Sequence, residues 1–140
     1  MDFTIHPVTW HDAEPLLRAV REAVFIREQG VTAELEWDGL DEDSHHILAL
    51  SYAGQAIGCG RILSNAHIGR IAVLQEWRGK KVGTALLEGL LIYASNRHYH
   101  GVDLDAQVQA LPFYQRFGFV AEGEVFMDAN IPHRKMRMQL

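Results

Sequence analysis

The chain has 140 residues, of which 48% are hydrophobic and 22% are charged. This length and composition describe one folded domain, residues 1–140, with a core of its own, and they exclude a disordered chain. The formal net charge of -5 argues against a nucleic-acid partner, because proteins that bind nucleic acids usually present a basic surface.

The sequence also bears on the compartment. It has a single cysteine, Cys59, so an internal disulfide framework is excluded and a reducing compartment is expected. The longest nearly apolar run, Ala85 to Ala94, is interrupted by Glu88. It is shorter than the roughly 20 residues that a membrane-spanning helix needs. We therefore expect a cytoplasmic protein without membrane association.

The first half of the sequence predicts a strand, a helix and then three strands. Phe3 to Val8 is rich in β-forming residues, and apolar residues from Leu16 to Phe25 recur at helical spacing before Gly30. After an acidic segment come three strands with short turns, which favour antiparallel neighbours. These strands are His46–Tyr52, Gln55–Leu63 and His67–Leu74.

The acidic segment, Glu34 to Asp43, carries six carboxylates. A run of like charges usually forms a solvated face, and this is our expectation here. The alternative is that the segment attracts a cationic acceptor such as a polyamine or a lysine side chain. Arg61 and Arg70 lie in predicted strands, where an inward-facing arginine needs a partner. They would pair with Glu28 or an acidic-segment residue, or steer an acidic group of a substrate.

The second half predicts a helix at Lys81–Asn96, a short strand at Val102–Ala106 and a short helix at Leu111–Phe117. Gly118 ends that helix, and another strand follows from Phe119. The complete order, β-α-βββ-α-β-α-β, predicts a mixed α/β (α+β) sheet.

A loop of two glycines and three cations, RGKKVG at Arg78–Gly83, joins the third of the three strands to the apolar helix. A strand followed by a glycine-containing loop and a helix N-terminus is an arrangement that binds phosphates. The triphosphate-binding and dinucleotide-binding glycine patterns are both absent. Without further evidence, a cationic surface turn is an equally good interpretation.

The same loop resembles the Arg/Gln-x-x-Gly-x-Gly/Ala pattern of the GNAT acetyltransferase superfamily. It matches at Arg78 and Gly83 and places Lys81 at the first glycine. We expect a helical φ at Lys81, which admits a lysine, and an amine that replaces close backbone approach with charge. The segments VFIREQGV, GRIAV, IPHRKM and DAQVQALPFYQRFGF extend the resemblance over nearly the whole chain and look like the ElaA/YjcF-like branch.

The resemblance implies a GNAT fold, with a central sheet of six to seven strands splayed in the middle to hold acetyl-CoA. The segment Gly69–Leu74 would diverge from Val102–Ala106, and the pantetheine arm would pair with the backbone of Ile71 and Val73. The residues it implies for the cofactor are Ile71, Ala72, Val73, Arg78, Gly79, Lys80, Lys81, Val82, Gly83, Thr84, Asp105, Phe113 and Tyr114.

The implied activity is direct transfer of acetyl from acetyl-CoA to an amine of a small molecule or a peptide. The Val73 N–H would stabilise charge on the thioester oxygen, and Tyr114 would act as general acid for the CoA thiolate. Glu28, His46 and His133 are candidates for the base, as is a water chain. The residues expected at the acceptor are Glu28, His46, Arg70 and His133.

Several alternatives remain at this point. Tyr114 would otherwise be a packed aromatic residue, and the chain would otherwise be a non-catalytic acyl-CoA-binding sensor or interaction domain. We expect no metal, because the pairs His45-His46 and His98-x-His100 lack the spacing of metal ligands. A monomer and a homodimer are both compatible with the sequence.

Overall fold

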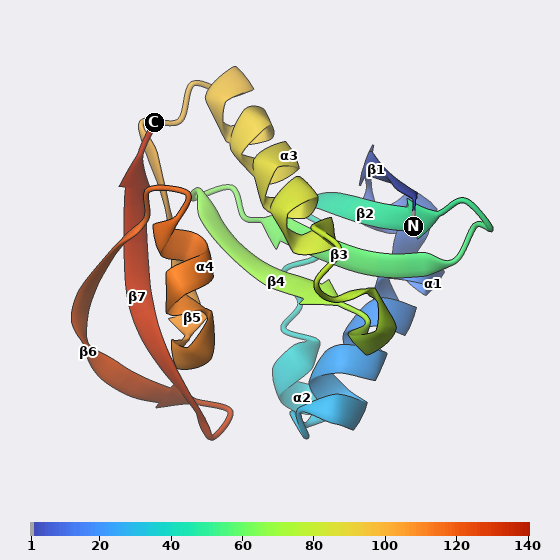
Figure 1. Ribbon diagram of the computed structural model, residues 1–140, viewed down its shortest axis with the longest axis horizontal. Coiled ribbons are helices and arrows are strands. Elements are labelled where there is room, and N and C mark those ends of the chain that lie inside the picture. The colour runs from blue at the N-terminus through green and yellow to red at the C-terminus, as the bar shows by residue number, and fades with distance from the viewer. Residues whose placement is uncertain (1) are drawn as a thin grey trace.

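The computed structural model describes residues 2–140, which form one seven-stranded sheet with helices on both faces (Figure 1). The strands are β1 (Phe3–Val8), β2 (His45–Ser51), β3 (Ala56–Ile62), β4 (His67–Val73), β5 (Gly101–Gln107), β6 (Val120–Asp128) and β7 (Ile131–Gln139). The α-helices are α1 (Trp10–Arg21), α2 (Ala33–Glu36), α3 (Val82–Asn96) and α4 (Leu111–Gln115). A π-helical segment, Glu22–Glu28, continues α1, and 3₁₀ turns lie at Gln75–Trp77 and Val108–Ala110.

The strand order is β1-β2-β3-β4-β5-β7-β6, and among the strands of residues 2–140 only the neighbours β4 and β5 are parallel. The mixed α/β sheet is therefore confirmed. The strand expected from Phe119 onward is in fact a hairpin, because Ala129 and Asn130 turn the chain with φ of 51° and 62°. Asparagine tolerates this left-handed region better than most residues, which makes the turn possible without glycine.

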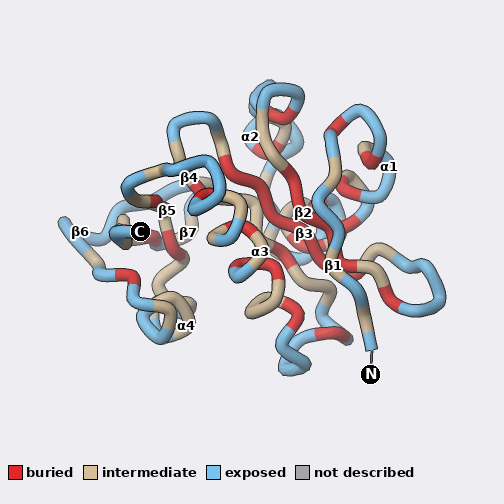
Figure 2. Tube along the Cα trace, turned by 90° about the horizontal axis from the view of Figure 1, so that it is seen from above, coloured by how far each residue is buried: buried red, intermediate tan, exposed pale blue. Residues whose placement is uncertain are grey.

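Two apolar clusters cover opposite faces of the first four strands. Side chains alternate along β2, so that Ile47 and Ala49 pack with α3 while Leu48 packs with α1. Helix α3 approaches β2 so closely that a Cβ at Gly89 would clash with Ile47 Cδ1. Buried residues concentrate in this half of the sheet, whereas β6 is exposed along nearly all of its length (Figure 2).

The chain that follows α1 brings two side chains, Phe25 and Gln29, toward the middle of the sheet. Thr9 caps α1 by accepting a hydrogen bond from the Asp12 N–H at 3.1 Å. The π-helical segment and the following turn, closed by Gly30 with φ of 74°, bring Phe25 and Gln29 next to the middle of the sheet. Within residues 2–140, no helix is long and apolar enough to cross a membrane.

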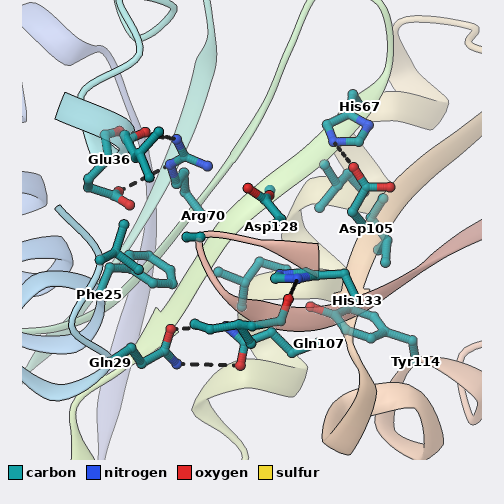
Figure 3. A pocket seen from close by; sticks show the side chains of 18 residues that line it. Phe25, Gln29, Glu36, His67, Arg70, Asp105, Gln107, Tyr114, Asp128 and His133 are labelled. Atoms are coloured by element: carbon teal, nitrogen blue, oxygen red, sulfur yellow. Dashed lines mark hydrogen bonds and ion pairs between the residues drawn. The ribbon is translucent and has the colours of Figure 1, made fainter. Parts of the chain in front are cut away.

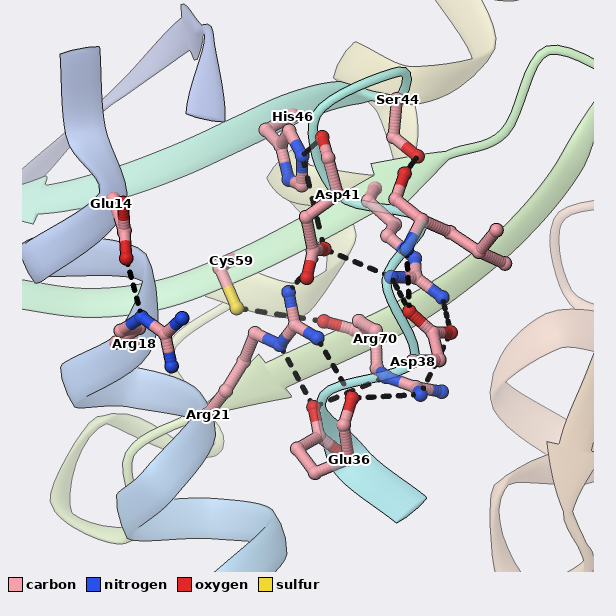
Figure 4. Close-up of polar contacts among 12 residues, drawn as sticks. Glu14, Arg18, Arg21, Glu36, Asp38, Asp41, Ser44, His46, Cys59 and Arg70 are labelled. Carbon is pink, nitrogen blue, oxygen red and sulfur yellow. Dashed lines mark hydrogen bonds and ion pairs between the residues drawn. The ribbon is translucent and has the colours of Figure 1, made fainter. Parts of the chain in front are cut away.

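The acidic segment is only in part the solvated face that we expected, with Glu34, Glu42 and Asp43 exposed. Three of its carboxylates turn inward and alternate with three arginines from α1, β3 and β4 (Figure 4). Going round, the order is Arg21, Glu36, Arg70, Asp38, Arg61, Asp41 and back to Arg21. The N···O distances lie between 2.5 and 3.1 Å. We call this closed set the charge ring.

The charge ring explains how Glu36 and Asp41 can be buried. Each guanidinium contacts two carboxylates and each carboxylate contacts two guanidinium groups, so the six charges balance. Burial raises the pKa of Asp38, but the hydrogen bonds from Arg61 and the Leu40 N–H and the charges of Arg61 and Arg70 together outweigh it and hold that pKa at about 2. The two strand arginines have therefore found acidic-segment partners, as one of the sequence alternatives predicted.

Removing one member of the charge ring should destabilise the fold strongly. Arg21 is 0% exposed, and Arg21→Met would leave two buried carboxylates short of a partner. We expect the free energy of unfolding to fall by about 3 kcal/mol, measured by urea denaturation. Arg137→Met is the matched control, because its pair with Glu122 is about half exposed and should contribute less than about 1 kcal/mol. Equal losses in the two variants would contradict this view of the ring.

Candidate active site

Strands β4 and β5 lie side by side only where they begin. Their register contains two residue pairs, His67 with Asp103 and Ile68 with Leu104. Further along, β4 stays with β3 while β5 stays with β7 as far as Gln107. The two strands diverge toward their carboxyl ends, so the predicted splay in the middle of the sheet is confirmed (Figure 1).

The backbone of Val73 faces the gap between these strands. The Leu74 N–H donates to the Ile57 carbonyl of β3 at 2.9 Å. Successive N–H groups of a strand point in opposite directions, so the Val73 N–H points away from β3. Ala72 does not meet the cofactor prediction, because its N–H faces β3 and its side chain, 4% exposed, packs in the core under α1.

A β-bulge lies where β4 leaves β5. Two residues, Arg70 and Ile71, stand opposite Gly60 of β3, and Arg70 has a φ of 53°. Bulges bend a strand and change the direction of its side chains. Here the bulge directs Arg70 toward Glu36 and Asp38 of the charge ring while its stem and Ile71 line the pocket.

The glycine and cation loop leads from the end of β4 into α3. Gly79 has a φ of 76°, and Lys81, the residue before the helix, has a φ of 69°. The expected helical φ at Lys81 is therefore wrong. A left-handed residue is needed there, which gives a physical reason for the glycine of the family pattern. Gly83 has room around it, because a Cβ would lie 3.7 Å from Phe113 Cζ.

The arginine of the loop is engaged within the protein. Arg78 donates through Nε to the Val73 carbonyl at 3.0 Å and through its two terminal nitrogens to Glu28 at 2.7 and 2.6 Å. These hydrogen bonds lower the pKa of Glu28. Lys80 donates to the Glu76 carbonyl at 3.3 Å and, like Lys81, is exposed. The loop therefore presents two exposed lysines, neither in an ion pair within residues 2–140, beside an arginine whose charge is balanced by Glu28.

A pocket lies beside the gap, between the π-helical segment and the β6–β7 hairpin (Figure 3). Gln107 of β5 donates to Gln29 at 2.9 Å, which ties one wall to the other. The hairpin contributes Asp128 and His133. The side chains that line the pocket thus come from five separate parts of the chain.

Tyr114 reaches this pocket from α4 (Figure 3). Its ring packs edge-on against Phe113 and Phe119, with centroid distances of 5.1 and 5.8 Å. Burial raises the pKa of its hydroxyl to about 12. The side chain is therefore a packed aromatic residue that carries a protonated hydroxyl at a pocket wall.

The structure separates the three candidates for the base. His133 lines the pocket, and its Nδ1 lies 2.6 Å from the Ile131 carbonyl. Glu28 is outside the pocket, in its ion pair with Arg78. His46 is 1% exposed, packs on Trp10 and donates from Nε2 to the Asp41 carbonyl at 2.8 Å. Because this places His46 away from the pocket, its predicted contact with the acceptor is corrected.

Sequence reasoning missed a polar cluster at the closed end of the gap. His67 Nδ1 lies 2.5 Å from Asp103 Oδ1, and Nε2 lies 3.8 Å from Asp105 Oδ2. Asp103 and Asp105 alternate along β5, which was a signal that they share a face, but the partner strand was unknown. Among residues 2–140, no group of three or more acidic, histidine or cysteine side chains has the arrangement of a metal site.

Comparison with known proteins identifies the family. A family model described as an acetyltransferase (GNAT) domain matches residues 14–140. The chain belongs to the GNAT acetyltransferase family. It is also 40% identical over 122 residues to the uncharacterised N-acetyltransferase YjcF of Bacillus subtilis, an alignment that covers 84% of this chain and 86% of that protein.

Two solved structures match this GNAT fold over nearly its full length. The crystal structure of Escherichia coli ElaA matches with a TM-score of 0.86 at 29% identity, covering 99% of this chain and all of the other. A GNAT family acetyltransferase from Elizabethkingia anophelis, solved with acetyl-CoA bound, matches with a TM-score of 0.72 at 22% identity, covering 99% of this chain and 98% of the other. The resemblance to the ElaA/YjcF-like branch is thus confirmed.

The left-handed φ at Lys81 gives a stability prediction. Lys81→Gly removes a side chain that is unfavourable at this φ, so the free energy of unfolding without ligand should rise by about 1 kcal/mol. Lys80→Gly is the matched control. Lys80 is not in the left-handed region, so that glycine should lower the same free energy by up to about 1 kcal/mol. Urea denaturation measures both, and a loss of stability in Lys81→Gly would contradict the assigned backbone geometry.

Proposed function

We propose that the chain is an acetyl-CoA-dependent N-acetyltransferase that transfers acetyl directly to an amine of a small molecule or an exposed amino group. The observation that carries this proposal is the gap between β4 and β5, with the Val73 N–H facing it and the phosphate-type loop at its wide end. An extended pantetheine arm can pair with such a strand edge as an added strand does. Family membership and the acetyl-CoA bound to the Elizabethkingia anophelis protein support it.

In this proposal the loop and the first turn of α3 hold the pyrophosphate. The N–H groups that begin a helix have no partner within it, and the helix dipole favours an anion there. Lys80 and Lys81 add positive charge at the same place, and Gly83 leaves space beside Phe113. The other cofactor contacts proposed at this end of the gap are Gly79, Val82 and Thr84.

The chemistry needs groups for the carbonyl oxygen and the leaving sulfur. Negative charge develops on the thioester oxygen as the amine attacks, and the fixed Val73 N–H is proposed to stabilise it. Tyr114 is proposed to donate its proton to the departing CoA sulfur. Its raised pKa keeps the hydroxyl protonated at neutral pH until the sulfur leaves. Water then restores the phenol.

The pocket suits an amine acceptor because acidic groups predominate on its open surfaces. Asp105 and Asp128 line it, whereas the charge of Arg70 is balanced by the charge ring. A protonated amine approaching the site therefore meets carboxylates rather than cations. The pocket therefore favours a cationic acceptor. The sequence alternative assigned this attraction to the acidic segment, whereas here the negative charge belongs to Asp105 and Asp128.

Ligand-dependent thermal unfolding tests the cofactor part of the proposal. Acetyl-CoA and CoA, each at a hundred times its dissociation constant, should stabilise the fold by about 2.7 kcal/mol and raise Tm by roughly 5–10 °C. NAD at the same concentration should leave Tm unchanged. An unchanged Tm with all three compounds would reject the proposed cofactor site.

Tyr114→Phe tests the catalytic part. The variant should lower kcat for a primary amine acceptor by about a hundredfold, while the Tm shift with CoA stays within about 1 °C of the wild type. Tyr52→Phe is the control, because Tyr52 is 74% exposed and lies outside the pocket. CoA release is followed as free thiol. Binding of acetyl-CoA without turnover of any amine would favour the non-catalytic sensor instead.

A further inference from the structure

His67, Asp103 and Asp105 form a second polar centre at the place where β4 and β5 begin to diverge. His67 and Asp105 line the pocket (Figure 3). Asp103, which is not part of the pocket lining, contacts His67 Nδ1. The three side chains are about 30% exposed, so they are sheltered without being closed off. The acetyl transfer proposed above gives none of the three a role in proton transfer.

The histidine has a defined orientation. A carboxylate only accepts hydrogen bonds, so the 2.5 Å contact with Asp103 requires a proton on His67 Nδ1. In the neutral ring, Nε2 then carries a lone pair. That nitrogen lies on the side of Asp105, which lines the pocket. A histidine held by a carboxylate in this way is the arrangement of a general base.

Asp105 lacks a partner of its own. Its Oδ1 is buried and makes no hydrogen bond among the described residues, and its Oδ2 lies too far from His67 Nε2 for one. The separation of 3.8 Å is nevertheless less than twice a hydrogen-bond length, so one nitrogen atom can lie within hydrogen-bond distance of both. A carboxylate with one buried, unpaired oxygen favours a cation beside it.

We propose that Asp105 binds the ammonium group of a primary alkylamine acceptor and that His67 Nε2 removes its proton, with Asp103 as the positioning residue. This proposal rests on the proposed acetyltransferase function. The N–H bond breaks, and its proton forms an imidazolium that lies between two carboxylates. The freed nitrogen lone pair attacks the thioester carbon, the C–S bond breaks, and the sulfur receives the Tyr114 proton. The new amide nitrogen releases its second proton through water to the Tyr114 oxygen, which restores the phenol, and solvent takes the first proton from His67.

The pocket offers one rival. His133 also lines it, but its Nδ1 contacts a backbone carbonyl, and no carboxylate lies within 4.0 Å of its ring among the described residues. An imidazolium at His133 would therefore lack the two negative neighbours that stabilise one at His67. This difference makes His133→Gln the informative comparison.

The first experiment compares two nucleophiles. Propylamine is protonated at neutral pH and needs a base, whereas methoxyamine is already unprotonated. His67→Gln should lower kcat/KM by at least about a hundredfold with propylamine and by less than about tenfold with methoxyamine. His133→Gln should lower both equally or neither, and His11→Gln, an exposed histidine outside the pocket, should match the wild type. Equal losses for the two nucleophiles in His67→Gln would overturn the proposal.

The second experiment does not depend on turnover. Histidine-labelled protein saturated with CoA is observed by ¹⁵N NMR of the imidazole rings while propylammonium is added. His67 should have its proton on Nδ1, Asp103→Asn should move it to Nε2, and propylammonium should shift the Nε2 signal in the wild type but not in Asp105→Asn. A proton on Nε2 in the wild type, or no response to propylammonium, would overturn the proposal.

The two experiments separate the possible failures. If propylammonium shifts the His67 signal but no amine is acetylated, the amine site stands and the acetyltransferase function fails. If amines are acetylated and His67→Gln is unimpaired, the function stands and the role of His67 fails. Asp43→Asn, an exposed carboxylate outside the pocket, controls for general effects of removing one negative charge.

Discussion

The separation of β4 from β5 is the constraint on which the rest of the molecule depends. After the second residue pair, each strand exposes one edge of polar backbone that a continuous sheet would have satisfied. The sheet is thereby divided into two parts, one of β1 to β4 and one of β5, β7 and β6, and both parts contribute to one apolar cluster. Leu86 of α3, Ile68 of β4 and Met136 of β7 all belong to that cluster. The fold can therefore keep an open strand edge in the middle of the sheet, where backbone N–H and C=O groups are free to hydrogen-bond a ligand.

The charge ring keeps one wall of this opening in place. Arg70 holds a left-handed φ within a strand, which is unfavourable for a residue with a side chain. Its guanidinium reaches Glu36 and Asp38, and these carboxylates are themselves held by Arg21 and Arg61. Because buried ion pairs add little net stability, the ring acts mainly by fixing one arrangement of α1, the acidic segment and the bulge.

Much of the fold was predictable because it follows local patterns. The antiparallel run β2–β3–β4 and the apolar helix α3 came from alternation, turn residues and periodicity. The loop at Arg78–Gly83 was found from its glycines and cations, but the φ of Lys81 was not, since lysine rarely adopts a left-handed conformation. The turn at Ala129-Asn130 could not be predicted either, because its two left-handed residues are not glycines.

What could not be predicted depends on contacts between distant residues. His67 and Asp103 are 36 positions apart, and only the parallel register of β4 and β5 brings them together. The closed order of the charge ring likewise joins arginines from three elements, so the acidic segment alone looked solvated. Tyr114, Phe113 and Asp105 were proposed only through the family resemblance, because an aromatic pair or a single strand aspartate has no specific signal of its own.

The one cysteine of the chain has a practical consequence. Cys59 in β3 is 1% exposed, and burial raises the pKa of its thiol to about 12. Alkylating and oxidising reagents attack the thiolate, which is therefore almost absent in the folded protein. Modification of Cys59 requires the centre of the sheet to open. The rate at which a thiol reagent labels Cys59 would therefore report how often this core opens from the native state.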